Sequence, residues 1–129
     1  VSSNAQSATA GARKLLEENP QINLLVGFNE WSTLGVGMAI KELGLKDRVC
    51  AIGFDNNTEC VGMLETGELD TLIVQNPFSM GYLAVMNAAN ILSGKKTESV
   101  IKTDVYVVDR SNMFSADVQK ILFGFDKYD

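Results

Sequence analysis

The sequence predicts an α/β protein in which strands and helices alternate around a mostly parallel sheet. Four short and nearly continuous apolar runs are spaced along the 129 residues, as expected for strands that are covered on both faces. Longer segments with helical periodicity separate these runs, and neither an internal repeat nor a low-complexity tract interrupts the order. The predicted strands are residues 22–28, 49–54, 69–74 and 105–108.

Start and stop signals bound the predicted helices. Asn4 can cap the first helix, and Asn19 with Pro20 stops it. We expect Ser32 or Thr33 to cap the second helix and Gly44 to end it. Small residues within that helix favour close packing on the sheet: Gly35, Gly37 and Ala39. The predicted helices are residues 4–18, 32–43, 58–65, 77–92 (opened by Pro77) and 115–122.

Composition excludes several classes of function. The net charge is −5 and no run of Lys or Arg is present, so a nucleic-acid backbone would be repelled. The chain contains no His, which excludes Ser-His-Asp and Cys-His catalysis and His-based metal sites. We therefore predict no catalytic residue, no metal and no cofactor. Because the first residue is Val1 and no signal peptide follows, we expect the sequence to start within a longer protein.

The two cysteines, Cys50 and Cys60, leave two interpretations open. They could form a disulfide, but a separation of ten residues across a strand–helix boundary is no recognisable framework. The spacing favours two small, buried apolar side chains.

Polar side chains follow three successive predicted strands at the point where each strand ends. These residues are Asn29, Asp55 and Gln75. In open α/β sheets, ligands bind beyond the carboxyl ends of the strands, so we expect the three side chains to converge on one crevice. A carboxylate can accept from two sugar hydroxyls, and an amide can donate to one hydroxyl and accept from another. Each could also be an ordinary turn, cap or loop residue.

Aromatic residues lie beside these polar positions. Phe28, Phe54 and Trp31 could cover the apolar face of a sugar ring, although Phe28 and Phe54 could instead belong to the core. Gly35-Val36-Gly37 lacks the further glycine of a dinucleotide fingerprint, and no phosphate loop is present. A glycosidase role for Glu30 and Asp55 has no support beyond the presence of two carboxylates.

The order of several short segments resembles the sugar-binding type I periplasmic proteins, which include ribose- and galactose-binding proteins, with the effector domains of lac-repressor-like regulators as relatives. The resemblance runs from about Thr9 to Val108. The matching segments are Asn19-Pro20-Gln21-Ile22, Gly27-Phe28-Asn29-Glu30, Ile52-Gly53-Phe54-Asp55, Gly67-Glu68-Leu69-Asp70, Val74-Gln75-Asn76-Pro77 and Leu92-Ser93-Gly94-Lys95.

This resemblance implies a periplasmic-binding-protein-like I fold of two lobes that close on a monosaccharide, without catalysis. The Asn, Asp and Gln that the family's second lobe supplies to the ligand match Asn29, Asp55 and Gln75. It further implies that residues 1–76 are an incomplete second lobe, that residues 77–102 pack on the missing first lobe, and that residues 103–129 form a return strand and terminal helix. Expected partners are a small-molecule sugar, the first lobe and the permease of an ABC-type transporter.

The family leaves the biological role and some contacts open. The alternative to a transporter component is the effector domain of a lac-repressor-like regulator or the extracellular sensor domain of a signalling kinase. Ser3 stands where pentose binders commonly have an aromatic residue, and Trp31 stands at a usually polar position. We expect an extracellular or periplasmic location, with a lipid anchor as one option, and self-association through residues 77–92 if their apolar side stays uncovered.

Overall fold

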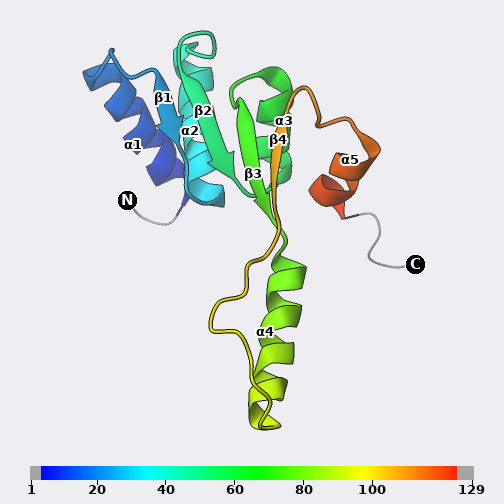
Figure 1. Cartoon of the computed structure of the whole chain (residues 1–129). Coiled ribbons are helices and arrows are strands. Elements are labelled where there is room, and N and C mark those ends of the chain that lie inside the picture. Colours follow the sequence, from blue (N-terminus) through cyan, green and yellow to red (C-terminus); the bar gives the residue numbers. More distant parts are fainter. Residues whose placement is uncertain (1–3, 125–129) are drawn as a thin grey trace. The chain divides into compact units, whose positions relative to one another are not determined.

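The computed structural model describes residues 4–124, which form five helices and four strands in strict alternation (Figure 1). The predicted α/β class is confirmed. In chain order the elements are α1 (Ala5–Glu18), β1 (Leu24–Val26), α2 (Glu30–Leu43), β2 (Cys50–Phe54), α3 (Thr58–Thr66), β3 (Thr71–Gln75), α4 (Pro77–Leu92), β4 (Val105–Asp109) and α5 (Ala116–Phe123).

The four strands form one sheet in the order β1-β2-β3-β4. β1, β2 and β3 run parallel, with Val26 beside Ile52 and Phe54 beside Ile73. Because these strands are parallel, their carboxyl ends lie at the same edge of the sheet. The first strand is shorter than the predicted 22–28, and Leu24 is 49% exposed, so the expectation that both of its faces are covered was wrong for the described residues.

The chain divides into two compact units: one runs to Val74 and resumes at Val107, and the other is Gln75–Tyr106. Unit 1 holds the buried core, to which the sheet, α2, α3 and the chain after Val107 contribute. Its fully or nearly fully buried apolar residues include Ile40, Val49, Ala51, Leu64, Leu69, Leu72, Val74, Val108, Met113 and Leu122. The segment after Val107, called the return segment below, is thus part of the same core as the first 74 residues.

Helix α2 is the most buried helix of unit 1, with seven buried residues. Its glycines allow close approach, but only partly as predicted. A Cβ atom on Gly35 would lie 2.4 Å from the Cβ of Ala8 in α1, and one on Gly37 would lie 2.4 Å from the sulfur of Met63. The expectation of packing on the sheet was therefore wrong for Gly35, whereas a Cβ atom on Gly37 would also lie 3.4 Å from the side chain of Leu69, the first residue of the predicted third strand. Gly35 instead lets two helices come together, because no side chain separates them.

The cysteines are both free thiols, so the disulfide alternative is wrong for this structure. Cys60 is fully buried, as expected, but Cys50 at the start of β2 is exposed. The apolar run of residues 49–54 begins one residue before the strand, and alternation along β2 turns Cys50 outward while Ala51 is buried.

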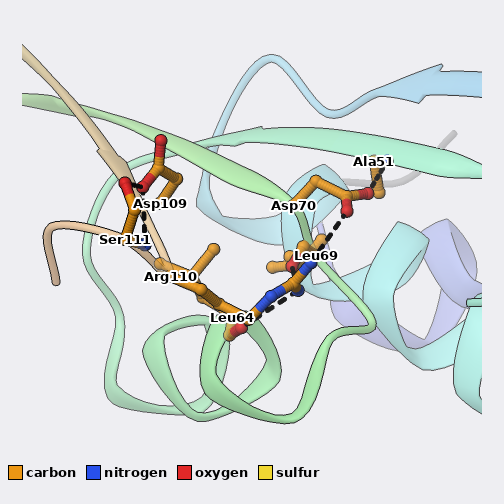
Figure 2. A network of polar contacts seen from close by, with 7 residues as sticks. All are labelled: Ala51, Leu64, Leu69, Asp70, Asp109, Arg110 and Ser111. Carbon is orange, nitrogen blue, oxygen red and sulfur yellow. Dashed lines mark hydrogen bonds and ion pairs between the residues drawn. The ribbon is translucent and has the colours of Figure 1, made fainter.

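A cluster of polar contacts joins the chain after β4 to the first part of unit 1 (Figure 2). The Arg110 guanidinium donates to the carbonyl oxygen of Leu69 at 3.2 Å and pairs with Asp70 Oδ1 at 3.3 Å. The other Asp70 oxygen accepts from the backbone N–H of Ala51 at 2.8 Å. In the residue before Arg110, hydrogen bonds from Ser111 lower the pKa of the Asp109 carboxyl. Arg110 therefore links the chain after β4 to the start of β3 and, through Asp70, to β2.

Unit 2 consists mainly of α4, which begins with Pro77 as predicted and has no buried residue. Asn76 caps it by accepting from the Ser79 N–H at 3.0 Å. A hollow of about 270 Å³ lies within the unit, lined by Met80, Leu83, Ala84, Asn87, Glu98, Ser99, Ile101 and Thr103. No helix in the described part of the chain is long and apolar enough to cross a membrane.

Candidate sugar-binding site

Two glycines and one threonine bring the start of α2 against the carboxyl ends of β1 and β2. A Cβ atom on Gly27 would lie 2.5 Å from the Thr33 nitrogen, and one on Gly53 would lie 2.1 Å from Thr33 Cγ2. The Thr33 hydroxyl is fully buried and accepts from the Phe54 N–H at 2.8 Å. Thr33, which was expected as a possible helix cap, is instead a buried link between the helix and the end of β2.

Asn29 is the N-cap of α2, so the prediction of Ser32 or Thr33 as the cap was wrong. Its Oδ1 accepts from the Ser32 backbone N–H at 2.9 Å, and the Ser32 hydroxyl accepts from the Asn29 N–H at 3.0 Å. This reciprocal capping box fixes the exposed Asn29 side chain. The Asn29 amide group donates to no acceptor among the described residues, so its N–H groups can reach a ligand.

Asp55 follows β2 with a φ of 71°, which makes it the one non-glycine residue with positive φ among those described. Its two successors serve the fold. Asn57 caps α3 and donates to Glu30 Oε1 at 2.7 Å, and Asn56 donates to the carbonyl oxygen of Leu122 at 2.7 Å. The half-buried Asp55 carboxylate, by contrast, takes no hydrogen bond from any described residue. It is the polar group at this strand end that the fold leaves unused.

The register of the sheet places Asn29 and Asp55 at neighbouring strand ends. Val26 lies beside Ile52, and the Gly27 N–H donates to the Ile52 carbonyl at 2.9 Å. One residue further, the rings of Phe28 and Phe54 are 6.1 Å apart at an interplanar angle of 31°. Asn29 and Asp55 are the residues that directly follow these two rings in the sequence.

The aromatic residues at these ends are largely exposed. Phe28 is 77% exposed and Trp31, in the first turn of α2, is 44% exposed, while Phe54 is half-buried. The alternative that Phe28 belongs to the core is therefore wrong. An exposed aromatic ring beside an unengaged carboxylate provides both an apolar surface and a hydrogen-bond acceptor.

Gln75 is the last residue of β3 and the first residue of unit 2. Its side chain is exposed and has no hydrogen-bond partner in the part of the chain that the structure describes. The convergence of Gln75 with Asn29 and Asp55 stays a prediction.

Carboxylates gather near the start of α3. Burial raises the pKa of the Cys60 thiol to about 12, and the negative charges of Glu30, Glu59 and Asp55 add to this effect. The buried Cys60 thiol therefore lies close to three carboxylates, one of them that of Asp55. Within residues 4–124, no group of three or more His, Cys, Asp or Glu residues is arranged to hold a metal ion.

Two hollows of unit 1 lie away from these strand ends. One of about 480 Å³ is lined by residues of α1, α2 and α3, including Thr9, Arg13 and Met38. Another of about 320 Å³ lies at the amino ends of the strands beside Asn23, Cys50 and Asp70. Neither hollow is lined by Asn29 or Asp55. The candidate site rests on side-chain placement and not on either of these two hollows.

The periplasmic binding protein domain family matches residues 1–96 of the chain. The chain belongs to the periplasmic binding protein family. The resemblance to its sugar-binding type I members, expected from the sequence, is confirmed. The ribose import binding protein of Haemophilus influenzae is 31% identical over 94 residues, covering 73% of this chain and 32% of that protein. The ribose import binding protein of Bacillus subtilis is 34% identical over 87 residues, 67% of this chain and 28% of that protein.

Solved structures of periplasmic binding proteins share the fold. A carbohydrate transporter solute-binding protein from Agrobacterium radiobacter, in complex with D-arabinose, superposes with a TM-score of 0.85 at 30% identity, covering 95% of this chain and 41% of that one. An ABC transporter solute-binding protein from Agrobacterium vitis with bound D-fucose has a TM-score of 0.83 at 30% identity, with coverage of 94% and 42%. The chain spans about a third of the length of the curated relatives that it matches.

Proposed function

We propose that this chain forms part of a solute-binding protein that binds a monosaccharide without catalysis and delivers it to an ABC-type sugar transporter. The observation that carries the proposal is the Asp55 carboxylate, which takes no hydrogen bond from the described residues beside exposed aromatic rings. It lies at the strand edge where α/β proteins bind ligands. The relatives named for ribose and the neighbours holding D-arabinose and D-fucose supply the ligand class.

Each polar side chain has a role that suits its contacts. Asp55 accepts from two neighbouring hydroxyls, because both of its oxygens are available. Asn29 donates through its amide nitrogen, because its oxygen is already engaged by Ser32. Gln75 can donate and accept at the end of β3. Phe28, Phe54 and Trp31 cover the C–H face of the sugar ring.

Helix α4 supplies the contact with another part of the protein. Exposed apolar side chains lie around the whole helix, and a helix that is apolar on all sides is normally buried. Since the chain spans about a third of its relatives, we assign this contact to the first lobe of the full-length protein. The assignment keeps residues 1–76 and 103–129 in the second lobe and residues 77–102 against the first. The match to the periplasmic binding protein domain supports a periplasmic or extracellular location, and a lipid anchor is one form of attachment within this proposal.

Calorimetry on the full-length protein with D-ribose, D-allose, D-arabinose and D-fucose tests the proposal. We expect saturable binding of at least one sugar. Charge-assisted hydrogen bonds contribute about 1.5–3 kcal/mol each, so losing two of them in Asp55→Ala should weaken affinity by roughly two to four orders of magnitude. Asn29→Ala should cost less.

The 129-residue chain provides a second test. It supplies one wall of the site, whereas small-ligand sites usually bury about 70–90% of their ligand. We therefore expect the chain alone to bind these sugars no more tightly than about millimolar. If Asp55→Ala leaves the sugar affinity of the full-length protein unchanged, the proposed site is refuted. If the full-length protein binds none of the four sugars, the proposed ligand class is refuted.

A further inference from the structure

Asp55 holds a backbone conformation that its own side chain does not stabilise. Its φ of 71° lies in the left-handed region, which costs energy for residues other than glycine and persists only where the surroundings impose it. Asp is one of the residues that tolerate this region, partly because its side chain can bond locally. Here the carboxylate makes no such bond within the described residues, so the conformation must be imposed by neighbouring groups.

Hydrogen bonds on both sides of Asp55 impose it. Before it, the Phe54 N–H donates to the Thr33 hydroxyl at 2.8 Å, and the Asp55 N–H itself donates to the Ile73 carbonyl at 3.0 Å. After it, the Asn56 amide donates to the carbonyl oxygens of Ile121 and Leu122 at 3.3 and 2.7 Å. The sheet and α2 therefore fix the incoming chain, and α5 fixes the outgoing chain.

The Asn56 contact is with the last turn of α5. The last four carbonyl groups of a helix have no partner within it, and Asn56 satisfies two of those in α5 from 65 and 66 residues away in sequence. Leu122 is itself 3% exposed, so the end of α5 is anchored in the core of unit 1. The contact therefore joins a buried helix end to the residue directly after Asp55.

We propose that Asn56 is a positioning residue for sugar recognition, and that the last turn of α5 supports the binding carboxylate through it. This inference rests on the proposed function, in which Asp55 touches the sugar. Asn56 itself contacts the protein and not the ligand. Without its amide, residue 56 loses its tie to α5, and Asp55 can leave the left-handed region and turn its carboxylate away from the ligand.

The test compares Asn56→Ala with Arg110→Ala in the full-length protein. Both changes remove hydrogen bonds that fasten the return segment, but Arg110 acts at the start of β3 and not at the strand ends that carry the site. We expect Asn56→Ala to weaken the tightest-bound sugar of the panel roughly tenfold or more, as loss of an outer hydrogen-bonding partner does for metal ligands. Arg110→Ala should leave affinity within about twofold at a similar loss of thermal stability. Asn56→Gln, which keeps the amide, should recover part of the affinity.

Hydrogen exchange of the Asp55 amide in the sugar-free protein gives a readout that is independent of the ligand. We expect Asn56→Ala to accelerate this exchange about tenfold or more and Arg110→Ala to change it little. If Asn56→Ala does not fold, Asn56→Ser, which keeps a shorter donor, replaces it. An unchanged exchange rate of the Asp55 amide in Asn56→Ala would overturn the proposal. So would losses of sugar affinity in Asn56→Ala and Arg110→Ala that are equal for an equal loss of thermal stability. If the wild-type protein binds no sugar, the proposed function fails, and exchange still decides whether Asn56 positions Asp55.

Discussion

Helices α2 and α4 have similar lengths but opposite surroundings. α2 has 14 residues, seven of them buried, whereas α4 has 16 residues and none buried. In α2 the glycines face α1 and Met63, so its small residues are used for close packing. In α4, Gly81 has no atom within 4 Å of where a Cβ would lie. The comparison shows that α4 carries the composition of a buried helix without the neighbours that would bury it.

A matched pair of isoleucine truncations tests this difference most strongly. Ile40 in α2 is fully buried, and Ile91 in α4 is 61% exposed. In the 129-residue chain, Ile40→Ala should lower the free energy of unfolding by about 2–5 kcal/mol, because it leaves a cavity. Ile91→Ala should change it by about 0.5 kcal/mol or less. Urea denaturation measures both values.

The same pair in the full-length protein sharpens the comparison. If α4 packs on the first lobe, Ile91→Ala should become clearly more destabilising there, while the effect of Ile40→Ala stays the same. An Ile91→Ala effect that is equally small in both proteins would show that α4 has no partner at this position.

A pair of glycine substitutions tests the close approach beneath the candidate site. Gly53→Ala would place a Cβ atom 2.1 Å from Thr33 Cγ2, so overpacking should destabilise unit 1 by about 1–3 kcal/mol. Gly62 in α3 has nothing within 4 Å, and Gly62→Ala should stabilise the helix by about 0.5–1 kcal/mol. Thermal unfolding distinguishes the two directions. Equal effects of both changes would contradict the contact between Gly53 and Thr33.

Thiol reactivity gives the smallest of the expected effects. Burial raises the pKa of Cys60 from its usual 9.0 to about 12, so this thiol should react with a disulfide reagent at pH 8 only when the fold opens. Exposed Cys50 should react first, although its pKa is also raised, by partial burial and Asp70. Two thiols that react equally fast in the folded protein would contradict this.

The same shift predicts a pH dependence of stability. Because the folded-state pKa of Cys60 is raised, the unfolded chain releases this proton more readily. The free energy of unfolding should therefore decrease as the pH rises from about 9 towards 12, and Cys60→Ser should reduce that slope. Denaturation at pH 8 and pH 10 measures the difference.

Local signals in the sequence were sufficient for most of the elements. Pro77 marks the start of α4, and Gly44 and Gly67 end α2 and α3 in the left-handed conformation. The start of α2 was placed too late because Ser32 and Thr33 are both good caps. The reciprocal hydrogen bonds between Asn29 and Ser32 form a capping box, which makes Asn29 the N-cap. The spacing Asn29-x-x-Ser32 is visible in the sequence and could have predicted this start of the helix.

The candidate site shows where sequence reasoning ends. Asn29 and Asp55 were predicted because parallel strands end at one edge, and that depends only on the order of elements. The roles of Thr33 and Asn56 were missed. Thr33 bonds to Phe54, 21 residues away, and Asn56 bonds to α5, 65 residues away, and neither partner has a local sequence signal. Such contacts arise from packing, so they become visible only in three dimensions.

The discontinuity of unit 1 has a consequence for synthesis on the ribosome. Strands β1, β2 and β3 are complete once Gln75 has been made, but β4 with buried Val108 begins about 30 residues later, and α5 with buried Leu122 ends almost 50 residues later. At about 5–20 residues per second, β3 remains an uncovered edge for several seconds. A nascent chain of this kind should recruit chaperones in that interval and become protease-resistant only after α5 has emerged.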